Sequence, residues 1–301
     1  MATTKSWIKA ARLRTLPLAL SGILAGSGLA WFYGAFSGLV SALAIVTAIL
    51  LQVFSNFAND YGDFQKGTDN RHRVGPVRTM QGGEINKTEM KRGMFTVGLL
   101  SLVFGVWLVY EGTWNQSKMA FAAFIGFGIL SLLAAYFYTA GKKSYGYIGL
   151  GDLSVFLFFG LLPVLGAFYL NAARLETLSI LPALSLGFFG AGVLNLNNMR
   201  DIENDRRSGK ITMASRMGEN LSRLYHAGLI IFGWGAVIIF TTIEQRSLWQ
   251  WLFVVSLPLF IRDLVKIARI REARQLDPFL KRLSLSTLLF TLLFCAGLIL
   301  S

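Results

Sequence analysis

The chain alternates long apolar runs, free of charged residues, with short polar segments. The runs cover 15–59, 93–110, 119–141, 153–173, 177–199, 224–243, 247–261 and 283–301. A helix of about 20 apolar residues spans the hydrocarbon core of a bilayer. The first run is long enough for two spans that break near 34–38, and each of the others supplies one. The pattern therefore predicts nine transmembrane helices, or seven if two of the runs lie flat or re-enter.

Two segments refine this pattern at its edges. The run at 247–261 is short for a span, so its helix is expected to continue past Arg262, whose side chain can snorkel to the interface. Residues 4–14 are basic and include Trp7, which predicts an amphipathic helix lying in the membrane interface.

The distribution of Lys and Arg tests both the span count and the direction of insertion. With nine spans and a cytoplasmic N-terminus, 26 of the 29 basic residues fall in cytoplasmic segments, and only Lys118, Arg174 and Arg246 fall outside. Cytoplasmic loops of membrane proteins carry an excess of Lys and Arg. The charges therefore predict a cell (inner) membrane protein with a cytoplasmic N-terminus.

Composition excludes several other classes of protein. The chain of 301 residues is 54% hydrophobic with a mean hydropathy of +0.54, which is too apolar for a soluble domain. The net charge of +13 is spread over short loops, which favours membrane topology and contact with lipid headgroups over nucleic-acid binding. A single cysteine, Cys295, excludes a disulfide framework and a cysteine-based metal site. One membrane domain, 1–301, is expected, with polar cap loops at about 60–92 and 200–223.

Two clusters of Asn and Asp close apolar segments that end on the same predicted membrane side. At about 100° per residue, the first cluster places its side chains on one helix face, and a further acid follows in the loop. The second cluster recurs at every fourth residue. The first comprises Asn56, Asn59, Asp60 and Asp63, followed by Asp69, and the second comprises Asn197, Asp201 and Asp205. Carboxylates are costly at a bilayer boundary unless cations compensate them.

The chemistry of these side chains points to a divalent cation and a phosphate ligand. Mg²⁺ prefers a few carboxylates together with phosphate oxygens and water. Mg²⁺ with Lys and Arg forms the usual clamp for a phosphate leaving group. Cations in or beside the same loops that suit the anion are Lys66, Arg78, Lys142, Arg200 and Lys210, and the hydroxyl of Tyr138 ends the fourth span on the same side. Ordinary helix caps and solvated charges explain one such cluster as well, but two matched clusters favour a site.

Two further charged residues leave their role open. Arg14 opens the first span, where it can reach the anion or simply obey the topology rule. Asp152 begins the fifth span, where it can serve as a helix N-terminal residue or as part of a site.

These motifs resemble the UbiA superfamily of intramembrane prenyltransferases over essentially the whole chain. The first motif of that superfamily, N-D-x-x-D with a further Asp, matches 59–69, and the second, D-x-x-x-D, matches 201–205. Its Y-x-x-x-K element matches Tyr138 and Lys142. The stretches 145–152 and 197–212 are similar to the MenA branch, which uses 1,4-dihydroxy-2-naphthoate. Gly67 stands where the superfamily usually has an acid, and Gly209 and Lys210 replace a third Asp, as in that branch.

The resemblance implies an all-α membrane fold of nine helices around a central cavity capped by the two cytoplasmic loops. It implies Mg²⁺ held by Asn59, Asn197 and the acids of both motifs, with Asp60, Asp63, Asp201 and Asp205 as the catalytic set. The implied reaction transfers a polyprenyl chain from its diphosphate to 1,4-dihydroxy-2-naphthoate, with loss of CO₂ and diphosphate. Its product is demethylmenaquinone, in menaquinone biosynthesis. The candidate contacts for the aromatic acceptor are then Arg14, Asn56 and Asp152.

Three alternatives stay open at this point. A related aromatic prenyltransferase would use homogentisate or 4-hydroxybenzoate. A transporter would carry ionisable groups near the bilayer midplane, whereas the apolar runs here are free of charge and the acids lie at their ends. A structural membrane protein would need no such acids. The residues alone indicate Mg²⁺-dependent chemistry on a lipid diphosphate.

Overall fold

Helices account for nearly all of the chain in the computed structural model, which describes residues 2–70, 74–141 and 144–301. The α-helices are α1 (Thr4–Ala11), α2 (Leu16–Phe32), α3 (Gly38–Gln65), α4 (Lys87–Thr113), α5 (Lys118–Phe137), α6 (Gly151–Phe156), α7 (Leu162–Ala172), α8 (Ile180–Arg200), α9 (Ile202–Arg207), α10 (Met213–Ile243), α11 (Leu257–Arg269) and α12 (Asp277–Ile299). Short 3₁₀ segments are η1 (Leu13–Thr15), η2 (Tyr145–Tyr147), η4 (Thr177–Ser179), η5 (Leu248–Ser256) and η6 (Ala273–Leu276), and a π-helical turn, η3 (Leu157–Leu161), joins α6 to α7. β-type pairing within the described ranges is limited to a bridge between Ile148 and Ile211.

Eight helical segments of the described chain are long and apolar enough to cross a membrane. The predicted break in the first run is confirmed, because α2 ends at Phe32 and α3 begins at Gly38. The ninth predicted span is helical from Leu248 to Arg269, past Arg262 as expected, but it is divided between η5 and the charged helix α11. The basic N-terminal segment forms α1, as predicted.

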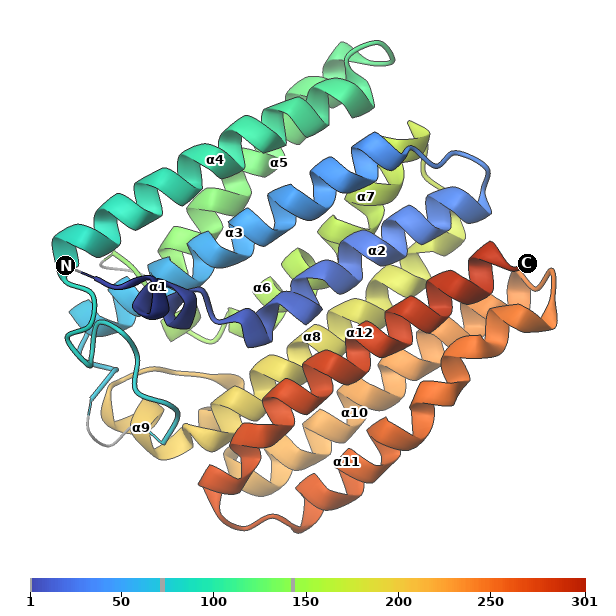
Figure 1. Cartoon of the computed structure of the whole chain (residues 1–301). Coiled ribbons are helices and arrows are strands. Elements are labelled where there is room, and N and C mark those ends of the chain that lie inside the picture. The colour runs from blue at the N-terminus through green and yellow to red at the C-terminus, as the bar shows by residue number, and fades with distance from the viewer. Residues whose placement is uncertain (1, 71–73, 142–143) are drawn as a thin grey trace.

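The long polar connections gather at one end of the helix bundle. Figure 1 shows α1, α9 and the α3–α4 connection together at that end, while the C-terminus lies at the other. Capping boxes fix where each connection returns to helix. Asn86 and Glu89 exchange side-chain and backbone hydrogen bonds at the start of α4, and Thr212 and Ser215 do so at the start of α10.

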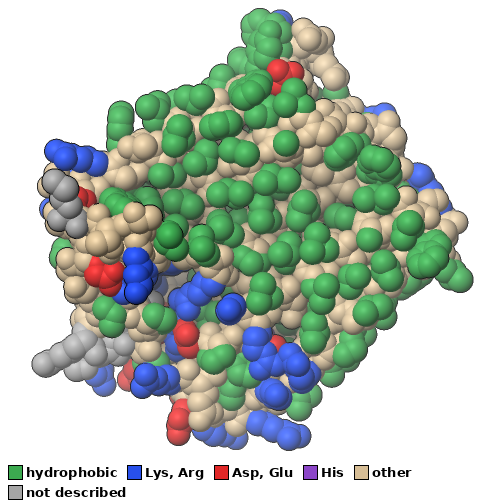
Figure 2. Space-filling model, in the orientation of Figure 1, with side chains coloured by type: hydrophobic (Ala, Val, Ile, Leu, Met, Phe, Trp, Pro, Cys, Tyr) green, Lys and Arg blue, Asp and Glu red, His purple; other side chains and the backbone are tan. Residues whose placement is uncertain are grey.

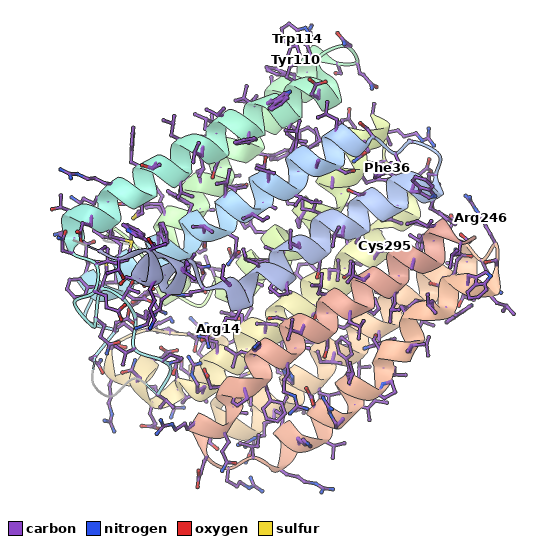
Figure 3. All side chains as sticks on the ribbon, in the orientation of Figure 1. Arg14, Phe36, Tyr110, Trp114, Arg246 and Cys295 are labelled. Atoms are coloured by element: carbon purple, nitrogen blue, oxygen red, sulfur yellow. The ribbon has the colours of Figure 1, made fainter. Side chains whose placement is uncertain are left out.

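The surface follows the same division. Figure 2 shows hydrophobic side chains spread over the flanks of the bundle, with Lys and Arg gathered toward the end that carries the polar connections. Figure 3 places Phe36, Tyr110, Trp114 and Arg246 toward the opposite end. Tyr110 and Trp114 stack with ring centroids 5.4 Å apart, an arrangement that suits the headgroup region. The chain is a multi-pass membrane protein.

The two halves of the bundle are packed differently. Aromatic side chains fill the space among α8, η5, α10, α11 and α12, where the rings of Phe189 and Phe260 are 5.0 Å apart and those of Trp234 and Phe290 are 5.4 Å apart. In the other half, α5 buries none of its most apolar window against the protein. One side of α5 instead lines the cavity described below.

Candidate active site

The first acidic cluster ends α3 at the mouth of this cavity. Asp60 and Asp63 are buried, although they belong to a helix terminus. Gly62 makes this possible, because a Cβ there would lie 2.4 Å from Thr139 Oγ1 and 2.7 Å from Ala140 N. The absent side chain lets α3 approach the end of α5, and Thr139 Oγ1 donates to the carbonyl of Ala58 at 3.1 Å. Glycine within the motif therefore sets the position of its acids.

One arginine holds all three acids of this cluster. From Arg78, Nη1 lies 2.6 Å from Asp63 Oδ2 and 3.5 Å from Asp60 Oδ1, and Nε lies 3.2 Å from Asp69 Oδ1. Arg12 forms a second ion pair with Asp60. Burial lowers the pKa of Arg78, but the three carboxylates outweigh burial and raise it. Arg78 is therefore a permanent cation at this site.

Tyr147 completes the polar surroundings of Asp63. Its hydroxyl donates to Asp63 Oδ1 at 2.8 Å and lies 2.5 Å from Thr68 Oγ1. Burial and the charge of Asp63 raise the pKa of Tyr147, so the phenol stays protonated and remains a donor. The ammonium of Lys66 lies 4.1 Å from the centre of the Tyr147 ring and also contacts Ser144.

The second acidic cluster spans the junction of α8 and α9. Arg200 binds both oxygens of Asp201, with Nε to Oδ1 at 3.0 Å and Nη2 to Oδ2 at 2.6 Å. It also donates to Asn197 Oδ1 at 2.9 Å and pairs with Asp277 at the start of α12. The side chain of Arg200 is 0% exposed. Arg200 was predicted to contact a phosphate, but the structure buries it between α8 and α12, away from the cavity lining.

Asp205 differs from Asp201 because its carboxylate is only loosely compensated. Lys210 Nζ lies 3.7 Å from Asp205 Oδ1, and Oδ2 is buried without a hydrogen bond from any described residue. Burial, together with the negative charges of Asp201 and Asp63, raises the pKa of Asp205 to about 6 against the lowering effect of Lys210. A buried acceptor without a donor is unusual in a folded protein, and such an oxygen suits a cation ligand.

The two clusters meet over one space. Asn204 Nδ2, on α9, donates to the carbonyl of Thr68 at 3.1 Å, and the amide of Ile211 donates to the carbonyl of Tyr147 at 3.0 Å. These bonds tie the second polar connection to the loop that follows α3. Lys210 Nζ lies 3.7 Å from Asp205 Oδ1 and 5.7 Å from the centre of the Tyr147 ring, whose hydroxyl donates to Asp63. The ends of the two motifs therefore lie beside a common region.

That region is the polar end of a cavity of about 400 Å³. Its polar end is lined by Asn59, Asp63, Arg78, Tyr138, Asn197 and Lys210. Its apolar walls come from α2, α3, α4, α5, α7, α8 and α12, including Ala44 and Leu51. A cavity with charged groups at one end and hydrocarbon walls fits an amphiphilic ligand with an anionic head.

Of the other predicted residues, Tyr138 and Asn56 line the cavity, whereas Arg14 and Asp152 do not. Tyr138 lines the cavity, and burial together with the charge of Asp152 raises its pKa; its predicted partner Lys142 lies outside the described residues. Asn56 also lines the cavity and donates to the carbonyl of Ala11 at 2.9 Å. Arg14, labelled in Figure 3, lies 3.7 Å from Asp277 and is not part of the lining. Asp152 accepts a 3.3 Å hydrogen bond from Tyr225 in a separate apolar groove.

The donor set suits a metal that shares its coordination with substrate. In the described parts of the chain, no three Asp, Glu, His or Cys side chains form a group able to hold a metal by themselves. The carboxylate and amide oxygens at the mouth are nevertheless hard ligands, and Mg²⁺ commonly completes its octahedron with phosphate oxygens and water. Asp205 Oδ2 supplies an acceptor with no protein donor.

Sequence reasoning missed four contributors to this site. Arg12 and Thr79 both contact Asp60. Tyr147 contacts Asp63, and Asp277 contacts Arg200. Arg12 was assigned to topology alone. Tyr147 lies in the stretch 145–152, whose similarity to the family could have marked it as a site residue. Its partner Asp63 is 84 positions away in sequence, so the contact itself could not be predicted.

The family model of the UbiA prenyltransferase family matches residues 19–299. The chain belongs to this family. Similar curated relatives are the 1,4-dihydroxy-2-naphthoate octaprenyltransferases of Escherichia coli (strain K12) and Haemophilus influenzae. The first is 43% identical, covering 99% of this chain and 96% of the relative, and the second is 42% identical, covering 98% and 96%. The enzyme of the same name from Mycobacterium tuberculosis is 33% identical, covering 97% and 96%.

Solved structures of UbiA homologues share the fold. The apo UbiA homologue from Aeropyrum pernix K1 has a TM-score of 0.68 at 15% identity, covering 100% of this chain and 99% of that one. The Archaeoglobus fulgidus UbiA homologue bound to GPP and Mg²⁺ has a TM-score of 0.58 at 17% identity, covering 94% and 99%. The UbiA-like architecture predicted from the motifs is thus confirmed.

Proposed function

We propose that this UbiA-family protein transfers a polyprenyl chain from polyprenyl diphosphate to 1,4-dihydroxy-2-naphthoate. The observation that carries the proposal is one apolar cavity whose polar end is lined from both motifs, by Asn59 and Asp63 of the first and Asn197 of the second. The acceptor is supported by relatives at 43% and 42% identity over nearly the whole chain, which are named for that substrate.

The polar end and the apolar walls of the cavity orient the donor substrate. The prenyl tail lies along the apolar walls, and the diphosphate lies at the mouth, where Arg78, Lys210 and Tyr138 line the cavity and Lys66 is nearby. Arg200 acts through Asp201, which it holds by both oxygens. A guanidinium and an ammonium held at fixed positions stabilise charge as it builds on the departing diphosphate.

Mg²⁺ would be held by carboxylate and amide oxygens of both motifs. The residues are Asn59, Asp60, Asp63, Asp69, Asn197, Asp201 and Asp205. This assignment is supported by the oxygen-rich donor set, the unsatisfied Asp205 Oδ2 and the Mg²⁺ in a homologue with the same fold. When bound, Mg²⁺ neutralises diphosphate charge and makes it a better leaving group.

The reaction forms one carbon–carbon bond and breaks two bonds. The C–O bond to diphosphate breaks with its electron pair on oxygen, leaving an allylic cation that the apolar walls shield from water. The ring carbon that bears the carboxylate attacks this cation. The carboxyl group then leaves as CO₂, and its bonding pair restores the aromatic ring as demethylmenaquinol, the reduced form of demethylmenaquinone. Asn56 is assigned to meet the naphthoate, and the support for this assignment is that it lines the cavity, as Arg12 does.

The site is proposed to face the cytoplasm across a cell (inner) membrane. The support is the charge distribution, because the acidic mouth lies at the bundle end where Lys and Arg gather. Soluble naphthoate and Mg²⁺ would reach the mouth from that side, and the prenyl donor from the bilayer.

The test is a panel of aromatic acceptors with one prenyl donor. Purified protein with Mg²⁺ and a polyprenyl diphosphate is expected to release diphosphate and CO₂ in equal amounts with dihydroxynaphthoate. Asp63→Asn, which keeps the size of the side chain, is the matched inactive control. Faster turnover with homogentisate or 4-hydroxybenzoate would overturn the naphthoate assignment, and no transfer to any acceptor would overturn the transferase itself.

A further inference from the structure

Arg78 occupies an unusual position, since one guanidinium contacts every carboxylate of the first motif. The contacts with Asp60, Asp63 and Asp69 are 3.5, 2.6 and 3.2 Å. Nη1 also donates to the carbonyl of Asn59 at 3.2 Å. Carboxylates gathered in a buried site repel one another unless a cation compensates them. Arg78 therefore satisfies the same electrostatic need that a divalent ion would satisfy.

Arg78 also links the polar connection to α3. It lies on the connection between α3 and α4, where its amide donates to Gln81 Oε1 at 3.3 Å. The neighbouring Thr79 Oγ1 donates to Asp60 Oδ2 at 3.0 Å. Contacts with the carboxylates of α3 thus hold this connection over the cavity mouth, and any ligand that takes those carboxylates competes with the connection for them.

Arg78 differs from Arg200 because it borders the cavity. Arg200 is fully buried and bound at once to Asp201, Asn197 and Asp277, which belong to two different parts of the bundle. The Arg78 side chain is 13% exposed and lines the cavity itself. An anion bound at the polar end of the cavity would therefore lie beside this guanidinium.

We propose that Arg78 is a resident counter-cation that competes with the divalent metal for the first motif and moves to the diphosphate when the substrate binds. The inference rests on the proposed function. A metal that arrives alone must displace Arg78 and leave it without a partner. A metal that arrives with diphosphate gives Arg78 a new partner, so each ligand strengthens binding of the other.

Metal binding in the absence of turnover tests this inference. The probes are Mg²⁺ alone and Mg²⁺ with inorganic diphosphate, titrated into purified full-length protein by calorimetry and by thermal melting. For the unaltered protein, diphosphate is expected to tighten Mg²⁺ binding about tenfold, a typical coupling between sites. In Arg78→Gln, Mg²⁺ alone is expected to bind about tenfold more tightly, and the enhancement by diphosphate to shrink or vanish.

A matched control separates this exchange from general electrostatics. Lys210→Gln also removes one positive charge from the cavity lining, beside Asp205 rather than the first motif. If Arg78 only contributes bulk positive charge, both variants will tighten Mg²⁺ binding equally, and the inference is overturned. Unchanged or weaker Mg²⁺ binding in Arg78→Gln overturns it too, because a simple phosphate ligand would give that result.

A second variant keeps the test valid if Arg78→Gln does not fold. Arg78→Lys retains the charge, but one ammonium cannot span three carboxylates as a guanidinium does. It is expected to show metal affinity between the unaltered protein and Arg78→Gln, and an affinity at or below that of the unaltered protein would contradict the exchange. These binding results stand whether or not transfer to naphthoate is observed, so failure of the inference is distinct from failure of the proposed function.

Discussion

The two acidic motifs carry similar residues but are held in opposite ways. In the first, the cation is Arg78, which belongs to a polar connection and faces the cavity. In the second, the cation is Arg200, which is enclosed by the helices it joins. The first motif is therefore arranged to exchange its partners, whereas the second is a fixed joint between α8 and α12 with one loosely held acid, Asp205. Equivalent motif positions need not have equivalent roles.

The largest expected effect contrasts Asp63 with Asp201. Asp63→Asn is expected to lower kcat by about three orders of magnitude, in the range that follows loss of a group aimed at developing charge. The melting temperature of this variant should change little, because Arg78 would still form ion pairs with Asp60 and Asp69. Asp201→Ala should lose activity as well, and it should also destabilise the fold by about 3–5 kcal/mol, because Arg200 loses its bidentate partner while it stays buried.

Thermal melting and single-turnover assays of the two variants side by side measure this contrast. Arg78→Ala and Arg200→Ala give the reciprocal comparison, with the larger drop in melting temperature expected for Arg200→Ala. If Asp63→Asn and Asp201→Ala melt alike, the distinction between an exchanging and a fixed motif is wrong.

The second effect concerns pH and acts through Asp205. Its pKa of about 6 lies above the ordinary value of a free Asp, near 3.9, because burial disfavours the charged form. Mg²⁺ needs the carboxylate, so its apparent affinity is expected to fall as the pH drops below about 6, approaching tenfold per pH unit. The metal-free protein should show the opposite trend. Protonation favours the folded state between about pH 6 and 4, so this group adds stability as the pH falls through that window.

Asp205→Asn is expected to remove both trends. The measurements are Mg²⁺ titrations and melting curves from pH 5 to 8, with the unaltered protein as reference. Metal affinity that is flat across this range in the unaltered protein would show that Asp205 is not a ligand.

The smallest expected effect is on stability, at the helix caps where the two polar connections end. Asn86→Ala and Thr212→Ala each remove the side-chain cap of a capping box, which typically costs about 1 kcal/mol. The caps lie outside the cavity lining, so turnover should stay within about twofold of normal while the melting temperature falls slightly. A large loss of turnover in Asn86→Ala alone would show that the first connection must be held in register for catalysis.

Much of the fold is predictable from local properties of the chain. Charge-free runs of helical length locate the spans, and the turn near Gly34 to Gly38 divides the first run because glycine permits the positive φ of 73° at Gly34. The weakest prediction was the segment from Leu248 to Arg269. Whether its 3₁₀ and α-helical parts count together as a span depends on packing against α12, which no periodicity shows.

The site divides in a similar way. Of the residues that helical spacing groups on the two faces, Asn56, Asn59, Asp63 and Asn197 line the cavity, whereas Asp60, Asp201 and Asp205 do not. Partners distant in sequence were not predictable, because adjacent charges look alike until the fold selects between them. Arg200 is predicted from the sequence to bind phosphate, and the structure adds a partner that the sequence does not reveal, Asp277, which lies 77 positions later. Roles assigned to the remaining motif residues stay predictions.

The short helix α1 has a practical consequence. Lys9 pairs with Glu84, Arg12 pairs with Asp60, and the carbonyl of Ala11 accepts from Asn56. Residues 9–12 thus brace the polar end of the cavity from outside. A bulky fusion partner joined directly ahead of α1 would press on that brace and disturb the acids behind it.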